Sequence, residues 1–165
     1  MRKQTQCTRP LASVPLFAAK IGCLLLLSLL FIACNNKTKE DLYAQGMDHV
    51  QNGNHNGAIV LFKSALEKDQ NFVDARYQLA RVYLTTGKFE QAEKELQKVV
   101  RQNPNNSETQ LLLARLYNHT GKAENAIAEA QAYLSIDPSS SEAFDIIGAS
   151  YLILNNREAA VESFH

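Results

Sequence analysis

The residue types of this chain recur every 34 positions from about residue 39 onward. Alanine stands at the same point of the period in four successive copies, at Ala58, Ala92, Ala126 and Ala160. A period between roughly 20 and 50 residues is typical of an array of small units, each of which buries its apolar face against its neighbour. The period therefore predicts a stacked architecture and not a single closed core.

Other positions of the period also keep their chemical character. A small residue stands at Gly46, Ala80, Ala114 and Gly148, and a ring follows three residues later at His49, Tyr83, Tyr117 and Tyr151. Turn residues come next, at Gly53, Gly87, Gly121 and Asn155. Pro104 and Pro138 close the second and third units, where the first has Gln70. This pattern resembles the tetratricopeptide repeat (TPR) family over about Lys39 to His165.

The resemblance implies units of two antiparallel helices joined by a tight turn, in which glycine adopts the positive φ that ends the first helix at little cost. Apolar residues at helical spacing, such as Leu79, Val82 and Tyr83, are interpreted as core, and none is assigned to a cofactor. No segment of the repeats has a pattern that predicts a β-strand in place of a helix. The expected fold is all-α, a TPR solenoid of about three and a half repeats preceded by a signal peptide.

The expected helices cover residues 40–52, 56–69, 73–86, 89–102, 107–120, 123–136 and 141–154. The expected repeats are 39–72, 73–106, 107–140 and an incomplete 141–165. The sequence stops inside the second helix of the fourth unit, just after Phe164, which leaves that unit without a polar cap. We therefore expect the chain to be part of a longer repeat protein.

The first 39 residues contain no acidic residue, and Arg2, Lys3, Arg9 and Lys20 precede an apolar run that ends at Ala33. This is the charge order of a secretory signal. The run is too short for a spanning helix, which needs roughly twenty residues to cross the hydrocarbon core. Residues 1–33 are therefore predicted to be a signal peptide.

The residues Phe31-Ile32-Ala33-Cys34 resemble a bacterial lipoprotein lipobox. The resemblance implies cleavage before Cys34, lipidation of its sulfur, and a polar tether over residues 34–39. Asn35 then favours the outer membrane in a Gram-negative cell, by the sorting rule of that family. The alternative is that Cys34 is a free thiol at the end of an apolar segment.

The cysteines and charges agree with a secreted protein that binds other proteins. The three cysteines are Cys7, Cys23 and Cys34, so cleavage would leave one lipidated sulfur and neither a disulfide nor a thiolate metal site. Basic and acidic residues number 17 each, but four basic residues lie in the signal, which gives the remainder a net charge of about −4. Nothing indicates the basic face of a nucleic-acid binder.

The repeats contain no catalytic constellation: the His-Glu-x-x-His, Cys-x-x-Cys, phosphate-loop and Gly-x-Ser-x-Gly motifs are all missing from the sequence. His49 stands where the other repeats have a core tyrosine and is interpreted as a core histidine and not as a ligand. We therefore expect no enzyme activity, no cofactor and no metal.

In the TPR family the first helix of each unit lines a concave groove that holds a peptide or a partner helix. The residues expected there are Tyr43, Met47, Tyr77, Arg81, Leu84, Leu111, Arg115, Asn118, His119 and Asp145. Arg81 and Arg115 share a phase and are expected to stack, which suits an acidic segment or a C-terminal carboxylate, although both could be merely solvated. The Lys and Asn set of the chaperone-tail clamp is missing.

The lipobox, the tether and the segments 40–46 and 74–80 resemble the TPR lipoproteins of the PEP-CTERM/exosortase system. This implies a non-catalytic scaffold, lipid-anchored in the bacterial envelope, that serves protein sorting or exopolysaccharide production. One alternative is a TPR lipoprotein of pilus or outer-membrane assembly. Another is the docking arm of an envelope enzyme whose catalytic part lies outside this chain. The sequence leaves the oligomeric state open.

Overall fold

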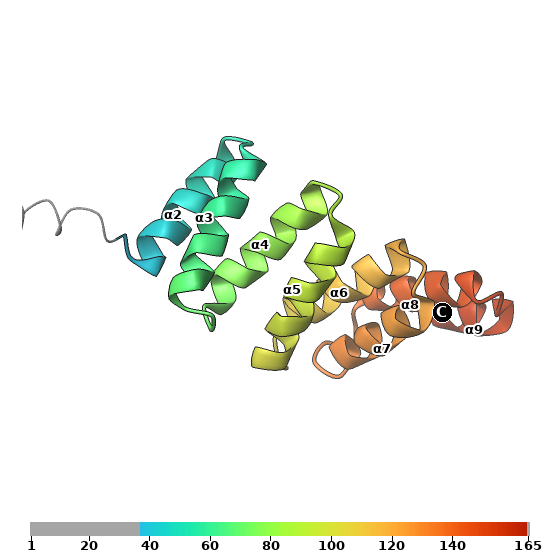
Figure 1. Cartoon of the computed structure of the whole chain (residues 1–165). Helices are drawn as coiled ribbons and strands as arrows, with labels where there is room; N and C mark the ends of the chain where they lie inside the picture. The colour runs from blue at the N-terminus through green and yellow to red at the C-terminus, as the bar shows by residue number, and fades with distance from the viewer. Residues whose placement is uncertain (1–36, 165) are drawn as a thin grey trace, which may run out of the picture. The chain divides into compact units, whose positions relative to one another are not determined.

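The computed structural model describes residues 37–164, and all regular secondary structure in this part is α-helical. The predicted signal peptide and Cys34 lie outside the described residues. The helices are α2 (Lys39–Gln51), α3 (His55–Lys68), α4 (Val73–Thr85), α5 (Phe89–Gln102), α6 (Ser107–His119), α7 (Ala123–Leu134), α8 (Ser141–Ile153) and α9 (Arg157–Ser163) (Figure 1).

Consecutive helices form four pairs, α2 with α3, α4 with α5, α6 with α7, and α8 with α9. Each predicted repeat contains one pair. Successive pairs also touch, because α3 packs on α4, α5 on α6 and α7 on α8. Among residues 37–164, no helix has both the length and the apolar character needed to span a bilayer.

The same turn joins the two helices of every pair. Its central residue has a positive φ of 70°, 71° and 75° at Gly53, Gly87 and Gly121, and of 60° at Asn155. The next backbone N–H returns to the carbonyl five residues earlier, as from Lys88 to Tyr83 at 2.8 Å. This bond satisfies a carbonyl that the helix end would otherwise leave unpaired. The four-fold recurrence of the turn explains the spacing of glycine in the sequence.

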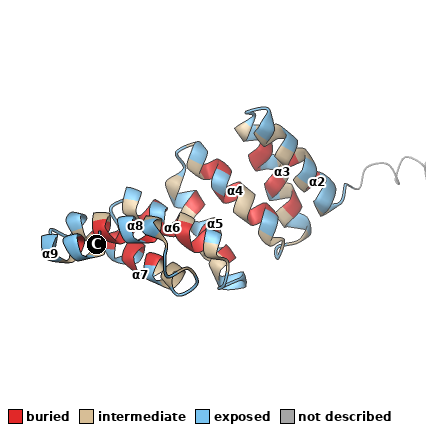
Figure 2. Cartoon of the chain, turned by 180° about the vertical axis from the view of Figure 1, so that it is seen from behind, coloured by how far each residue is buried: buried red, intermediate tan, exposed pale blue. Residues whose placement is uncertain are grey.

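The core lies where paired helices face each other (Figure 2). The alanines that mark the period are all buried, at Ala58, Ala92, Ala126 and Ala160. Each comes from a second helix. Their small side chains allow the helices to approach closely, so the period in the sequence is a period of helix contacts.

Candidate functional site

The structure places all ten residues predicted for the groove on the first helices of their pairs, α2, α4, α6 and α8. We call this side of the array the first-helix face. Four of the ten are exposed, namely Arg81, Arg115, His119 and Asp145. Leu111 is buried in the core, and the other five are partly buried. The exposed four are therefore the ones most open to a partner.

Tyr43 packs against two aromatic rings of the first repeat. Its ring centroid lies 5.3 Å from that of Phe72 and 5.8 Å from that of Phe62. Burial, together with the nearby carboxylate of Asp74, raises the pKa of the Tyr43 hydroxyl above its ordinary value. The ring thus packs between helices, and its hydroxyl stays protonated at neutral pH.

Tyr77 and Arg81 form a connected pair one turn apart on α4. Burial raises the pKa of the Tyr77 hydroxyl, and its hydrogen bond to the Glu108 carboxylate raises it further. The Arg81 guanidinium lies 5.9 Å from the centre of the Tyr77 ring, within reach of a cation–π interaction. Arg81 makes no ion pair within residues 37–164, so its charge is available to a partner.

Arg115 has a partner inside the chain. Its Nε lies 2.7 Å from Oε1 of Glu142, in the first turn of α8, and both side chains are about half exposed. The sequence does contain a signal for this pair. An acidic residue stands in the first turn of every first helix, at Glu40, Asp74, Glu108 and Glu142. This row supplies the carboxylates that Tyr77 and Arg115 contact.

Asn118 and His119 contact neighbouring helices. The Asn118 amide donates to the hydroxyl of the buried Ser150 at 2.9 Å, which joins α6 to α8. The His119 ring meets Phe89 edge to face, with centroids 4.9 Å apart. These contacts join α6 to the first helix of the next repeat and to the second helix of the previous one.

Two hollows lie beside the two arginines. One, of about 170 Å³, is lined by Arg115 and His119 together with Leu84, Phe89, Leu112 and Leu116. The other, of about 190 Å³, is lined by Arg81 together with Met47, Val50, His55, Gln78, Val82 and Thr85. Each hollow combines apolar walls with one guanidinium. Such a site can hold an apolar side chain and pair with a neighbouring carboxylate.

A tetratricopeptide repeat family model matches residues 49–110 and 95–148. The matched segments together span more than half of the chain, which therefore belongs to the tetratricopeptide repeat family. The TPR fold typically serves as a non-catalytic scaffold that binds proteins or peptides. A search of curated proteins finds no match for this chain.

Solved structures show the same fold. A crystal structure of a MamA protein is 25% identical, with a TM-score of 0.72 over 76% of this chain and 69% of that one. MamA from Desulfovibrio magneticus RS-1 is 18% identical, with a TM-score of 0.71 over 77% and 72%. A TPR protein from Parabacteroides merdae is 23% identical, with a TM-score of 0.71 over 76% and 50%. The resemblance to the last two extends to the fold alone.

Proposed function

We propose that this chain is a non-catalytic scaffold whose first-helix face holds a segment of a partner protein that carries both carboxylates and apolar residues. The observation that supports this most directly is that Arg81 and Arg115 occur one repeat apart and each lines a partly apolar hollow. A partner lying along the face would place one apolar side chain in each hollow and one carboxylate beside each guanidinium.

The pair between Arg115 and Glu142 does not block such a partner. Both side chains are about half exposed, and an exposed ion pair contributes only about 0 to 1 kcal/mol. A partner carboxylate can therefore replace Glu142 at little cost. Arg81 needs no such exchange, because it makes no ion pair within the described part of the chain.

The test is a double change of Arg81 and Arg115 to Ala, with binding of a partner measured by titration calorimetry. We expect affinity to fall by about ten-fold to a hundred-fold, with an unchanged helical circular dichroism signal, because both residues are exposed. Added salt should also weaken binding. Lys94→Ala, an exposed change on α5, is the control and should have no effect. A double variant that binds as well as the parent would place the partner elsewhere.

We also propose that Cys34 anchors the scaffold to the bacterial envelope through a lipid, on the outer membrane if the cell is Gram-negative. The charge order of residues 1–33 and the small residue before Cys34 support this. Cells grown with a clickable palmitate should label the product, and Cys34→Ser should remove the label. Equal labelling of the variant would exclude lipidation at this residue.

The process we propose is protein sorting or exopolysaccharide production of the PEP-CTERM/exosortase type. The resemblance of residues 40–46 and 74–80, together with the lipobox, supports this. Deletion of the gene should leave proteins with a PEP-CTERM segment unsorted, or reduce the secreted polysaccharide. A deletion strain that sorts and secretes normally would refute the assignment.

A further inference from the structure

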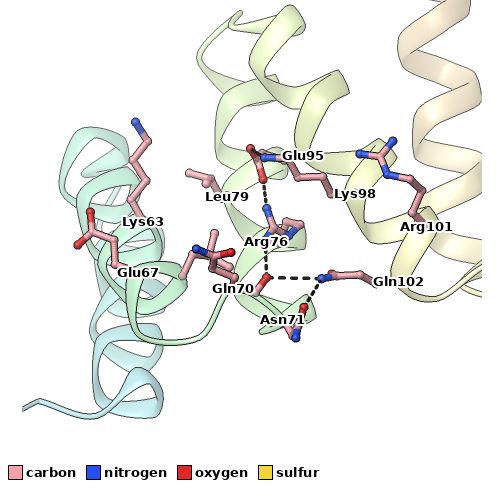
Figure 3. Close-up of a pocket in the computed structure, with 11 residues that line it drawn as sticks. Lys63, Glu67, Gln70, Asn71, Arg76, Leu79, Glu95, Lys98, Arg101 and Gln102 are labelled. Atoms are coloured by element: carbon pink, nitrogen blue, oxygen red, sulfur yellow. Dashed lines mark hydrogen bonds and ion pairs between the residues drawn. The ribbon is translucent and has the colours of Figure 1, made fainter.

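A charged cleft of about 740 Å³ lies away from the first-helix face, between the second helices of repeats 1 and 2. Helix α3 contributes Lys63 and Glu67 to one wall, and α5 contributes Lys98 and Arg101 to the other (Figure 3). Arg76 of α4 lies between the two walls. The volume falls within the range of about 300 to 1,000 Å³ that is typical of ligand sites.

Arg76 is an unusual residue for its position. The same phase holds Leu42, Gln110 and Phe144 in the other repeats. The Arg76 side chain is only 9% exposed; its Nη1 donates to the Glu95 carboxylate and its Nη2 to the backbone carbonyl of Gln70, both at 2.5 Å. Its Nε is buried and donates to no group in the described residues. A buried cation with an unused donor is costly to retain without a further role.

The fold itself does not require a charge at this position. In the next repeat, Gln110 occupies the same phase, and its side-chain amide donates to the carbonyl of Pro104 at 2.9 Å. That bond closes the loop between repeats in the same way as the bond from Arg76 to Gln70. An uncharged amide therefore suffices to close this loop, and the fold does not need the guanidinium of Arg76 for that purpose.

The basic residues of the cleft have no basic counterpart at the next boundary between repeats. Lys63 and Arg101 are exposed and make no ion pair within residues 37–164, whereas Lys98 shares the Glu95 carboxylate with Arg76, at 2.8 Å. Four basic and two acidic side chains line the cleft, a net charge of +2 in a domain that is acidic as a whole. At the next boundary, the positions of Lys63, Lys98 and Arg101 hold Gln97, Ala132 and Ser135.

We propose that this cleft is a second binding site, which takes the carboxylates of an acidic peptide segment. Lys63 and Arg101 attract the carboxylates from opposite walls, and the Arg76 guanidinium lies between them. The exposed amide of Gln102 donates to the Gln70 carbonyl at 3.4 Å and to Asn71 Oδ1 at 3.1 Å, weak bonds that a peptide backbone can replace. Glu67 and Glu95 disfavour a dianionic phosphate more than a single carboxylate.

Fluorescence anisotropy with the full chain in detergent tests the proposal. The probe is a fluorescein-labelled peptide of six glutamates, tested with a free and with an amidated C-terminus. Lys63→Gln with Arg101→Gln should raise its Kd about tenfold, because two attractive contacts are lost. Lys88→Gln with Lys94→Gln removes the same charge from exposed positions outside the cleft and should change Kd less than about twofold. If the amidated probe binds, the cleft recognises side-chain carboxylates. If the amidated probe does not bind and the free one does, the cleft recognises the C-terminal carboxylate.

Arg76 provides a readout that does not depend on a charge change. Its Nε–H resonance in a nitrogen-15 NMR spectrum should move on saturation with the glutamate peptide, and should stay in place with a peptide of six glutamines. The proposal would be overturned if the two double variants, in the cleft and outside it, lost the same affinity for the probe, or if the Arg76 resonance did not move. Binding of an oligogalacturonate in place of the peptide would also overturn it.

Discussion

At the scale of single residues, the side chains that face each other within a helix pair are matched in size. Gly46 of α2 lies against Phe62 of α3, so close that a Cβ on Gly46 would lie 2.5 Å from the ring. Gly148 and Phe164 repeat this arrangement in the last pair, at 2.4 Å. The middle repeats hold Ala80 and Ala114 in the glycine phase, with Leu96 and Ala130 in the phenylalanine phase. Glycine thus occurs where its neighbour is a phenylalanine ring.

We predict that Gly46→Ala lowers the free energy of unfolding by about 1 to 3 kcal/mol, because the fully buried Phe62 ring has no space into which to move. Urea denaturation followed by circular dichroism measures the change. Adding Phe62→Leu should recover part of the loss, since the pair then resembles Ala80 and Leu96. Additive losses in the double variant would show that the two positions do not interact.

Glu129 of α7 gives a prediction on pH. Burial raises the pKa of its carboxyl, so the folded state holds the proton more tightly than the unfolded state. The ionised carboxylate therefore destabilises the fold above its folded pKa, and has no effect below about pH 4, where both states are protonated. Glu129→Gln should raise the melting temperature at pH 7, and this gain should shrink as the pH falls. A gain of the same size at pH 3.5 would contradict the assignment.

For individual residues, the repeat phase predicts which helix carries a side chain. It does not predict the contacts that this side chain makes with other parts of the fold. The phase put Arg81 and Arg115 on first helices, but it did not reveal that Glu142 pairs with Arg115. The repeat phase does not point to Arg76, because the other repeats hold unrelated residue types at its position. Its partners, Glu95 and the Gln70 carbonyl, are 19 and 6 residues away and are brought together only by the fold.

At the scale of elements, helix positions follow closely from the sequence. The helix expected over 89–102 has those bounds in the structure, and most other ends differ by one residue. The largest difference is at the end of α7, expected at residue 136 and observed at Leu134. Pro138 disfavours helical backbone at Asp137, and the chain leaves the helix through a turn in which the Ile136 N–H donates to the Tyr133 carbonyl.

Helix caps give the prediction at this scale. The Asn106 side chain accepts hydrogen bonds from the backbone N–H of Thr109 at 2.9 Å and from its hydroxyl at 2.8 Å, and Thr109 is fully buried. Asn106→Ala should therefore lower the free energy of unfolding by about 1 kcal/mol in urea titrations. Lys88, the residue before α5, makes no capping bond with its side chain, and Lys88→Ala should cost clearly less. Equal costs would mean that the Asn106 cap does not stabilise α6.

At the scale of the whole molecule, the array is stabilised by contacts between neighbours. Within residues 37–164, α2 packs chiefly on α3 and α9 chiefly on α8, whereas α4 and α6 contact helices on both sides. We predict that amide hydrogen exchange is slowest in α4 to α7 and fastest in α2 and α9, because stability in a repeat array is a sum of neighbour terms. Uniform protection across all the helices would indicate one cooperative unit in place of a stack.

The most direct test of the central claim, that the first-helix face holds the partner, is a crosslinking map in living cells. A photo-reactive phenylalanine analogue is placed at Thr85 or Asp145 on that face, and at Lys94 or Glu124 on second helices, all exposed positions. We predict that light yields the same partner adduct from Thr85 and from Asp145, and none from Lys94 or Glu124. Adducts from the second-helix positions alone would contradict the account.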